Sequence, residues 1–300
     1  MGVVFTQIGA KVQEKIKMKQ KYSDLELQIK SVNYRKSILK YIKIADAGHT
    51  GGSLSCTDIL NVLYNDIMNV CPENFGDKNR DRFIQSKGHS VESLYVVLAD
   101  QGFFPESDLE TISKFQSKYV GHPTRKVNGI EFNTGALGHG LSLSAGIALA
   151  GKKDSLTYKV LTLLGDGELA EGSNWEAAMM AAHYKLDNLV AILDHNGLQI
   201  SGRIQDVCSP YPIDEKFKAF GWGVISVDGN SIPQLREAFG RIPAESGKPT
   251  LVIANTIKGK GVSYMENNAK WHHGVPKDNL YSQALEELDQ QLAELTRKMI

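Results

Sequence analysis

Residues 159–202 constrain the fold of this chain more than any other stretch. Two continuous apolar runs, 160–164 and 189–193, each stop at a polar triplet, the first at Gly165-Asp166-Gly167 and the second at Asp194-His195-Asn196. Such runs are typical of buried strands in a parallel sheet covered on both faces, and the segment 173–184 between them, rich in Ala, Met and Glu, favours a helix. A right-handed crossover places the second strand beside or near the first, so we expect Asp166 and Asn196 to emerge together at the carboxyl edge, where open α/β folds bind ligands.

The polar groups predicted at this edge favour a cation shared with phosphate. The carboxylate of Asp166, the amide oxygen of Asn196 and a backbone carbonyl just beyond it are hard oxygen donors, suited to Mg²⁺ or Ca²⁺ together with phosphate oxygens and water. Gly165 and Gly167 would let the backbone approach a diphosphate closely, because no Cβ stands in the way. Gly-Asp-Gly alone fits a strand-ending turn equally well. The Asn after the second strand is what favours the ligand site.

The rest of the chain alternates between predicted helices and strands. This predicts an α/β fold with a parallel sheet and helices on both faces. Further strands are predicted at 82–86, 222–227 and 250–256, and further helices at 31–47, 57–67, 91–100, 105–115, 142–151, 232–242 and 280–299. No repeat or linker divides the chain, so we interpret residues 1–300 as one domain, with 1–30 as a peripheral helical lead-in and 278–300 as a C-terminal helix.

Composition excludes several functional classes. Lys plus Arg and Asp plus Glu both number 34, which gives no electrostatic reason to expect nucleic acid or an anionic membrane as a partner. The three cysteines, Cys56, Cys71 and Cys208, are too scattered for a disulfide framework or a zinc site, which favours a reducing compartment and a cytoplasmic location. The N-terminus lacks a signal-like apolar core, and no apolar stretch reaches the roughly 18 residues of a membrane span.

Histidines and glycines recur together on the predicted loops. Five of the eight histidines adjoin a glycine, namely His49, His89, His122, His139 and His273. A lone histidine is usually structural, but five on strand-end loops at one sheet edge indicate a cavity that hydrogen-bonds oxygen-rich groups. The glycines of 135–140 precede a predicted helix, where they fit either an anion or tight helix packing. Lys258-Gly259-Lys260-Gly261 does not match a Walker A loop.

Taken together, these motifs resemble those of thiamine-diphosphate enzymes and, among them, transketolases. Asn196 follows Asp166 by thirty residues, as in the shared signature of that class, and the resemblance extends over nearly the whole chain. It includes Gly48-His49-x-Gly51, Ser86-Lys87-Gly88-His89, Gly121-His122-Pro123, Gly135-x-Leu137-Gly138-x-Gly140, Glu171-Gly172 and the Trp271-His272-His273-Gly274 segment. Each motif is weak alone, and the combination is highly specific.

The resemblance implies a role for individual residues. Asp166, Asn196 and the Leu198 carbonyl would hold Mg²⁺ against the diphosphate of thiamine diphosphate, with Ca²⁺ or Mn²⁺ as alternative ions. Cofactor contacts would come from His89, Gly135, Leu137, Gly165, Gly167, Asn196 and His272. Catalytic groups would be His49, His122, His272, His273 and Glu171. Among these, His49 and His122 would donate to substrate oxygens. Glu171 would lie at an interface between subunits that links paired active sites, where Glu176 would join it.

Two positions depart from the usual family pattern. The Trp271 segment has one His more than is usual, so the sequence does not separate His272 from His273. His139 stands where many relatives have Gln.

A larger departure is that the chain ends at Ile300, where full transketolases continue with a domain that supplies the pyrimidine-side glutamate. The resemblance therefore implies the N-terminal subunit of a split transketolase. Together with a separate C-terminal subunit, it would form a dimer of heterodimers and transfer a two-carbon ketol unit between sugars or sugar phosphates. Alternatives are a deoxyxylulose-phosphate-synthase-like subunit, the α subunit of a 2-oxo-acid dehydrogenase, or a non-catalytic paralogue.

Overall fold

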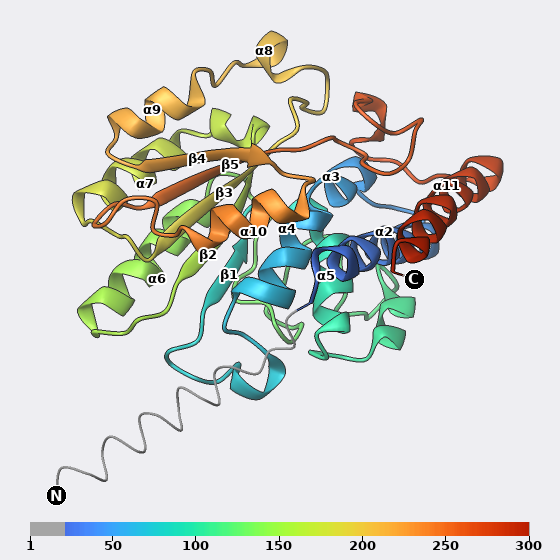
Figure 1. The fold of residues 1–300 in the computed structure, drawn as a ribbon, viewed down its shortest axis with the longest axis horizontal. Coiled ribbons are helices and arrows are strands. Elements are labelled where there is room, and N and C mark those ends of the chain that lie inside the picture. Colours follow the sequence, from blue (N-terminus) through green and yellow to red (C-terminus); the bar gives the residue numbers. More distant parts are fainter. Residues whose placement is uncertain (1–21, 300) are drawn as a thin grey trace, which may run out of the picture.

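The structure is a computed structural model that describes residues 22–299, and its centre is a five-stranded parallel sheet. The strand order is β1-β2-β3-β5-β4, and every pairing is parallel. The strands are β1 (Arg82–Gln85), β2 (Val160–Gly165), β3 (Leu189–His195), β4 (Gly223–Asp228) and β5 (Thr250–Asn255). Figure 1 shows helices on both sides of this sheet. The predicted fold class is confirmed, including the adjacency of β2 and β3.

Apart from α2, the larger elements form within a few residues of their predicted bounds. The longer helices are α2 (Asp24–Ala45), α5 (Val91–Asp100), α6 (Gly140–Lys153), α7 (Gly172–His183), α10 (Ile232–Gly240) and α11 (Asp278–Arg297), and the short ones are α3 (Thr50–Ser55), α4 (Thr57–Val62), α8 (Ile204–Val207) and α9 (Ile213–Ala219). The α11 helix packs against α2. Among residues 22–299, no helix has both the length and the apolar character needed to cross a membrane.

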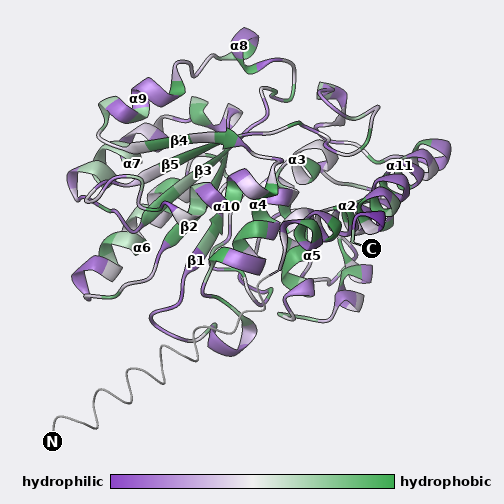
Figure 2. Ribbon diagram, in the orientation of Figure 1, coloured by the Kyte–Doolittle hydropathy of each residue, from purple (hydrophilic) through white to green (hydrophobic). Residues whose placement is uncertain are grey.

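The alternating side chains of the strands face two separate hydrophobic cores. Leu161 and Leu163 of β2 belong to the core shared with α2, α4, α5 and α10, whereas Val160 and Leu164 belong to the core under α6, α7 and α9. All six residues of β2 are buried. Figure 2 shows the largely hydrophobic strands between helices that carry both hydrophobic and hydrophilic residues. Burial on both faces explains why the runs lack polar alternation.

The first described helix begins and ends earlier than predicted. Ser23 and Glu26 form a capping box that starts α2 at Asp24, and Leu27 is fully buried, so 24–30 belong to this helix and not to a separate lead-in. The part of the predicted lead-in at 1–21 lies outside the described residues. The helix ends at Ala45 and not at Gly48, because Asp46 takes the left-handed C-cap conformation with φ 48°.

Two other local predictions are wrong. The helix expected at 105–115 is only a 3-10 segment, Glu106–Thr111. Conversely, Thr50–Ser55 is helical although Gly51 and Gly52 disfavour a helix. A Cβ on Gly51 would lie 2.7 Å from the carbonyl oxygen of Trp271, so this glycine is needed where two loops meet. Tertiary contact overrides local propensity at this point.

Candidate functional site

A cavity of about 380 Å³ lies at the carboxyl ends of the strands. The elements that end there are β2, which leads into Asp166, and β3, which leads into Asn196. Ten of the residues predicted for the site line the cavity: His49, His89, Gly135, Leu137, Gly165, Asp166, Gly167, Asn196, Leu198 and His272. The convergence of loops that are far apart in sequence agrees with the rule for ligand sites in open α/β sheets.

The predicted metal ligands form a group of oxygen donors. Asp166 is 2% exposed, and its carboxylate accepts from the backbone N–H of Gly167 at 2.8 Å and of Gly197 at 2.5 Å. The side-chain oxygen of Asn196 accepts from the Leu198 N–H at 3.2 Å. Burial, followed by the nearby Asp194 carboxylate, raises the pKa of Asp166. A divalent cation would offset that cost, so the donor set fits Mg²⁺.

Within the described part of the chain, no group of three or more His, Cys, Asp or Glu side chains is arranged to hold a metal. This agrees with the predicted donor set, which contains one carboxylate, one amide and one backbone carbonyl.

Four histidine rings from three loops gather around His49. The centroid of its ring lies 5.1 Å from that of His89, 6.1 Å from His122, 5.4 Å from His272 and 4.8 Å from His273. Burial lowers the pKa of His49 to about 4 and that of His272 to about 3, and it also lowers the pKa of His89 and His122. These four imidazoles are therefore neutral at pH 7 and can both donate and accept hydrogen bonds.

The structure separates the two histidines that the sequence could not. His272 lines the cavity, and its Nδ1 lies 3.0 Å from the Nζ of Lys258. His273 lies outside the cavity lining, against the His49 ring. The loop that carries both docks beside His49, since the Gly274 N–H donates to the Gly48 carbonyl at 3.1 Å.

Three predicted catalytic residues lie beyond the cavity lining. His122 and His273 contact the histidine cluster, and a Cβ on Gly135 would lie 2.5 Å from the His122 ring. Glu171 is exposed at the start of α7. His139 does not join the cluster as expected from the histidine pattern: it is exposed, and its Nδ1 lies against the carbonyls of Ala136 and Leu137.

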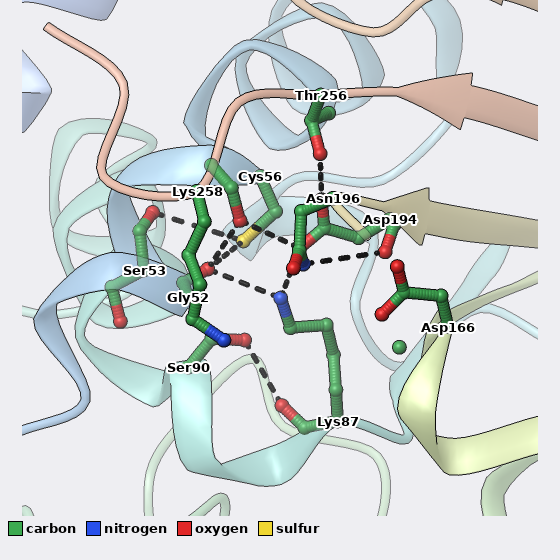
Figure 3. Close-up of polar contacts among 12 residues, drawn as sticks. Gly52, Ser53, Cys56, Lys87, Ser90, Asp166, Asp194, Asn196, Thr256 and Lys258 are labelled. Atoms are coloured by element: carbon green, nitrogen blue, oxygen red, sulfur yellow. Dashed lines mark hydrogen bonds and ion pairs between the residues drawn. The ribbon is translucent and has the colours of Figure 1, made fainter. Parts of the chain in front are cut away.

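A buried ion pair below the cavity had no predicted role. Lys87 and Asp194 pair with side-chain exposures of 2% and 0%. Asp194 also accepts from the hydroxyls of Ser55 and Thr256, and Lys87 donates to the Gly52 carbonyl at 3.1 Å (Figure 3). The pair thereby joins β3 to helix α3, to the loop of Lys87 and to the loop of Thr256. An Asp ending an apolar run and a Lys in a strand-end motif were the available signals.

Lys258 is a second cation that sequence reasoning did not assign to the site. Its Nζ lies 3.3 Å from the Leu198 carbonyl and 3.0 Å from His272, and it lines the cavity. Burial, followed by the charge of Lys87, lowers its pKa to about 8. Unlike Lys87, Lys258 forms no ion pair in the described part of the chain, so its ammonium group is available to an anionic group of a ligand.

Comparisons with known proteins agree with this geometry. Residues 29–291 match the family model described as "Transketolase, thiamine diphosphate binding domain". The chain belongs to the transketolase family. A crystal structure of transketolase from Campylobacter jejuni superposes with a TM-score of 0.82 at 30% identity, covering 89% of this chain and 43% of that one.

Relatives of matching length are named as subunits. One is a subunit of the apulose-4-phosphate transketolase of Phocaeicola vulgatus, which is 47% identical, covering 91% of this chain and 97% of the relative. The "6-deoxy-6-sulfo-D-fructose transketolase subunit SqwG" of a Clostridium species is 38% identical and is covered over 98% of its length. Human transketolase is also 38% identical, but this chain spans only 41% of it. The predicted identity of the chain, as one part of a split transketolase, is confirmed.

Proposed function

We propose that this chain binds the diphosphate of thiamine diphosphate through Mg²⁺ and completes a transketolase with a separate pyrimidine-side subunit. The observation that carries the proposal is the cavity in which the oxygens of Asp166 and Asn196 meet a cluster of neutral histidines. The chain that contains this cavity covers only 43% of the C. jejuni transketolase chain, which leaves the remaining part to a second subunit.

The residues of this chain would have different roles, which follow from their chemical groups. Asp166, Asn196 and the Leu198 carbonyl would hold Mg²⁺, while His89, Gly167 and Lys258 would face the diphosphate. Gly135, Leu137 and Gly165 would line the cofactor, and His49, His122 and either His272 or His273 would donate to substrate oxygens as charge develops. When bound, thiamine diphosphate supplies the nucleophilic carbon that carries the two-carbon ketol unit between a ketose and an aldose.

The second subunit follows from what a thiamine enzyme needs. Both ends of the cofactor must be held and oriented, and this chain offers the diphosphate end. Glu171 and Glu176 are both exposed, as interface residues must be in a separate chain. We propose a heterotetramer, a dimer of heterodimers, that acts in the cytoplasm.

The substrates are sugars, and the partner chain binds the end of the sugar that lies far from the reacting carbonyl, the tail. The names of the two relatives include a sugar phosphate and a sulfonated sugar, so an anionic tail is the first choice. Apulose 4-phosphate is the first donor to test, followed by pentose phosphates such as xylulose 5-phosphate with ribose 5-phosphate as acceptor.

The test is ketol transfer with thiamine diphosphate and Mg²⁺, measured for this chain alone and mixed with the product of the neighbouring reading frame. Activity in the mixture only supports the proposal, and activity of the chain alone would contradict the requirement for a second chain. Asp166→Ala is expected to lower activity of the mixture at least about a hundredfold and to abolish Mg²⁺-dependent cofactor binding while circular dichroism stays unchanged. Unaltered cofactor binding by this variant would contradict the metal assignment.

A further inference from the structure

Glu168 is a buried carboxylate that is not among the residues predicted for the site. It directly follows Gly165-Asp166-Gly167, is 2% exposed and lines the cavity, yet it forms no ion pair in the described part of the chain. A carboxylate removed from water needs strong partners, or its burial is costly. The contacts of Glu168 therefore indicate what the residue is for.

The partners of Glu168 come from its own segment, at the end of β2, and from two other loops of the cavity. One carboxylate oxygen, Oε2, accepts from the backbone N–H of Gly165 at 2.9 Å. The other, Oε1, accepts from the N–H of Gly138 at 2.8 Å and from the hydroxyl of Ser86. The Ser86 oxygen in turn accepts from the N–H of Gly140 at 3.1 Å.

These three loops carry the groups that the proposed function needs. Ser86 belongs to the loop of His89, Gly138 and Gly140 belong to the loop of Gly135 and Leu137, and Gly165 precedes Asp166. We propose that Glu168 is the positioning residue that fixes the spacing of these loops around the cofactor diphosphate and its metal. This inference rests on the proposed function.

The glycine loop is held from its other side as well. The Ser173 hydroxyl donates to the Gly138 carbonyl at 2.8 Å, and Gly138 has φ 85°. A Cβ on Gly138 would lie 2.5 Å from that of Glu171, so only glycine fits between the two contacts. The segment 168–173 therefore holds the loop through hydrogen bonds to both the N–H and the carbonyl of Gly138. The backbone N–H groups of Gly138, Gly140 and Gly165 are occupied within the chain, which favours the packing interpretation of these glycines over direct anion binding.

The donor pattern requires a carboxylate and rejects an amide. A backbone N–H faces each of the two oxygens, and an N–H cannot act as an acceptor. A glutamine at 168 would set its own NH₂ group against one of these N–H donors in either orientation. One of the two loops would then lose its anchor, although the volume of the side chain is almost unchanged.

The experiment compares Glu168→Gln with a control that lowers stability elsewhere. Leu189→Ala removes a fully buried side chain at the amino end of β3, the opposite end of the sheet from the cavity. Each variant is assembled with the partner subunit. The Kd of thiamine diphosphate at saturating Mg²⁺ is measured by tryptophan fluorescence quenching, together with Tm and the kcat/KM of the complex.

We expect Glu168→Gln to raise the cofactor Kd by about tenfold or more, as is usual when a group that orients metal ligands is lost. Leu189→Ala is expected to lower Tm but to leave Kd within about twofold of the wild type, because the space left by the missing side chain lies far from the residues that would bind the cofactor and its metal. Ser86→Ala keeps both N–H contacts of Glu168 and is expected to raise Kd by about threefold, which preserves the test if Glu168→Gln fails to fold.

Equal Kd values in Glu168→Gln and the control would show that Glu168 has only a structural role and would overturn the inference. If Glu168→Gln is unfolded, an unchanged Kd in Ser86→Ala would overturn it as well. Failure of the wild-type complex to bind thiamine diphosphate is a separate result. It would overturn the proposed function and, with it, this inference.

Discussion

Two buried glutamates, Glu168 in the cavity wall and Glu92 behind His49, have very different surroundings. Glu168 and Glu92 are 2% and 3% exposed. Glu168 receives a backbone N–H on each oxygen, at 2.8 and 2.9 Å, and a hydroxyl as well. Glu92 receives the Ser53 hydroxyl at 2.7 Å on one oxygen and, on the other, only a long contact of 3.4 Å from the His49 N–H. Similar burial is therefore combined with unequal numbers of donors.

Burial raises the pKa of both carboxyls, and the comparison teaches that the donors around each one oppose this cost to a different extent. Burial raises the pKa of Glu92 to about 7, because its donors only partly offset desolvation. A hydroxyl can reverse its role and accept a hydrogen bond, so a protonated Glu92 can donate to Ser53. The backbone N–H groups that face both oxygens of Glu168 can only donate. Glu92 accepts from the backbone of His49, and Glu168 accepts from the backbone of Gly165, beside Asp166.

The largest expected effect is the opposite response of the two sites to the same isosteric change. Glu168→Gln is expected to lower the free energy of unfolding by about 4 kcal/mol at pH 8, since it replaces charge-assisted hydrogen bonds with a donor–donor contact. Glu92→Gln is expected to raise it, because the amide can accept from His49 and donate to Ser53. Urea denaturation of both variants and the wild type measures the difference. Equal destabilisation by both changes would break the comparison.

The second expected effect is a pH dependence of stability that comes from Glu92. The folded pKa of about 7 lies above the usual glutamate pKa of 4.5, so the folded state keeps a proton that the unfolded state has already released. Stability of the wild type therefore falls as pH rises from about 4.5 to 7, by up to about 3 kcal/mol.

The difference in unfolding free energy between Glu92→Gln and the wild type isolates this contribution from the other titrating groups. It is expected to be largest at about pH 8 and to shrink towards zero below about pH 4.5. Denaturant titrations across this pH range measure it. A difference independent of pH would mean that Glu92 is ionised throughout.

Much of this architecture was predictable from the sequence. The unit β2-α7-β3 was predicted to within two residues because runs buried on both faces leave an unmistakable pattern. The cavity position followed from the same unit, and His49, His89 and His272 converge on it as the motifs predicted.

What the sequence did not predict depends on tertiary contact. Glu168 was overlooked because two of its partners are the backbone N–H groups of Gly138 and Gly165, which carry no side-chain signal, and the third, Ser86, is distant in sequence. The role of Gly51 depends on the Trp271 carbonyl, and that of Gly167 on the Gln199 side chain, whose Cγ would lie 2.7 Å from an added Cβ. His139 lies outside the histidine cluster because of the conformation of its own loop, in which its ring lies against the carbonyls of Ala136 and Leu137. Motif spacing alone determines none of these contacts.

The smallest expected effect comes from the hydroxyl that distinguishes the Glu92 site. Ser53→Ala removes the closer of the two donors to Glu92 and leaves only the 3.4 Å contact from His49. At pH 8, where the carboxylate is ionised, the loss of unfolding free energy is expected to be about 1 kcal/mol. Below about pH 4.5 it should be smaller, because a protonated carboxyl depends less on a donor.

Because the lost hydroxyl favours the charged form of Glu92, its removal should raise the pKa of this carboxyl further and move the pH dependence of stability upward. The matched control is Ser55→Ala, which removes a neighbouring buried hydroxyl that donates to Asp194 and should leave the pH dependence of Glu92 in place. Denaturant titrations of both variants over the same pH range measure the shift. A shift of equal size in both would show that the Ser53 contact does not set the charge state of Glu92.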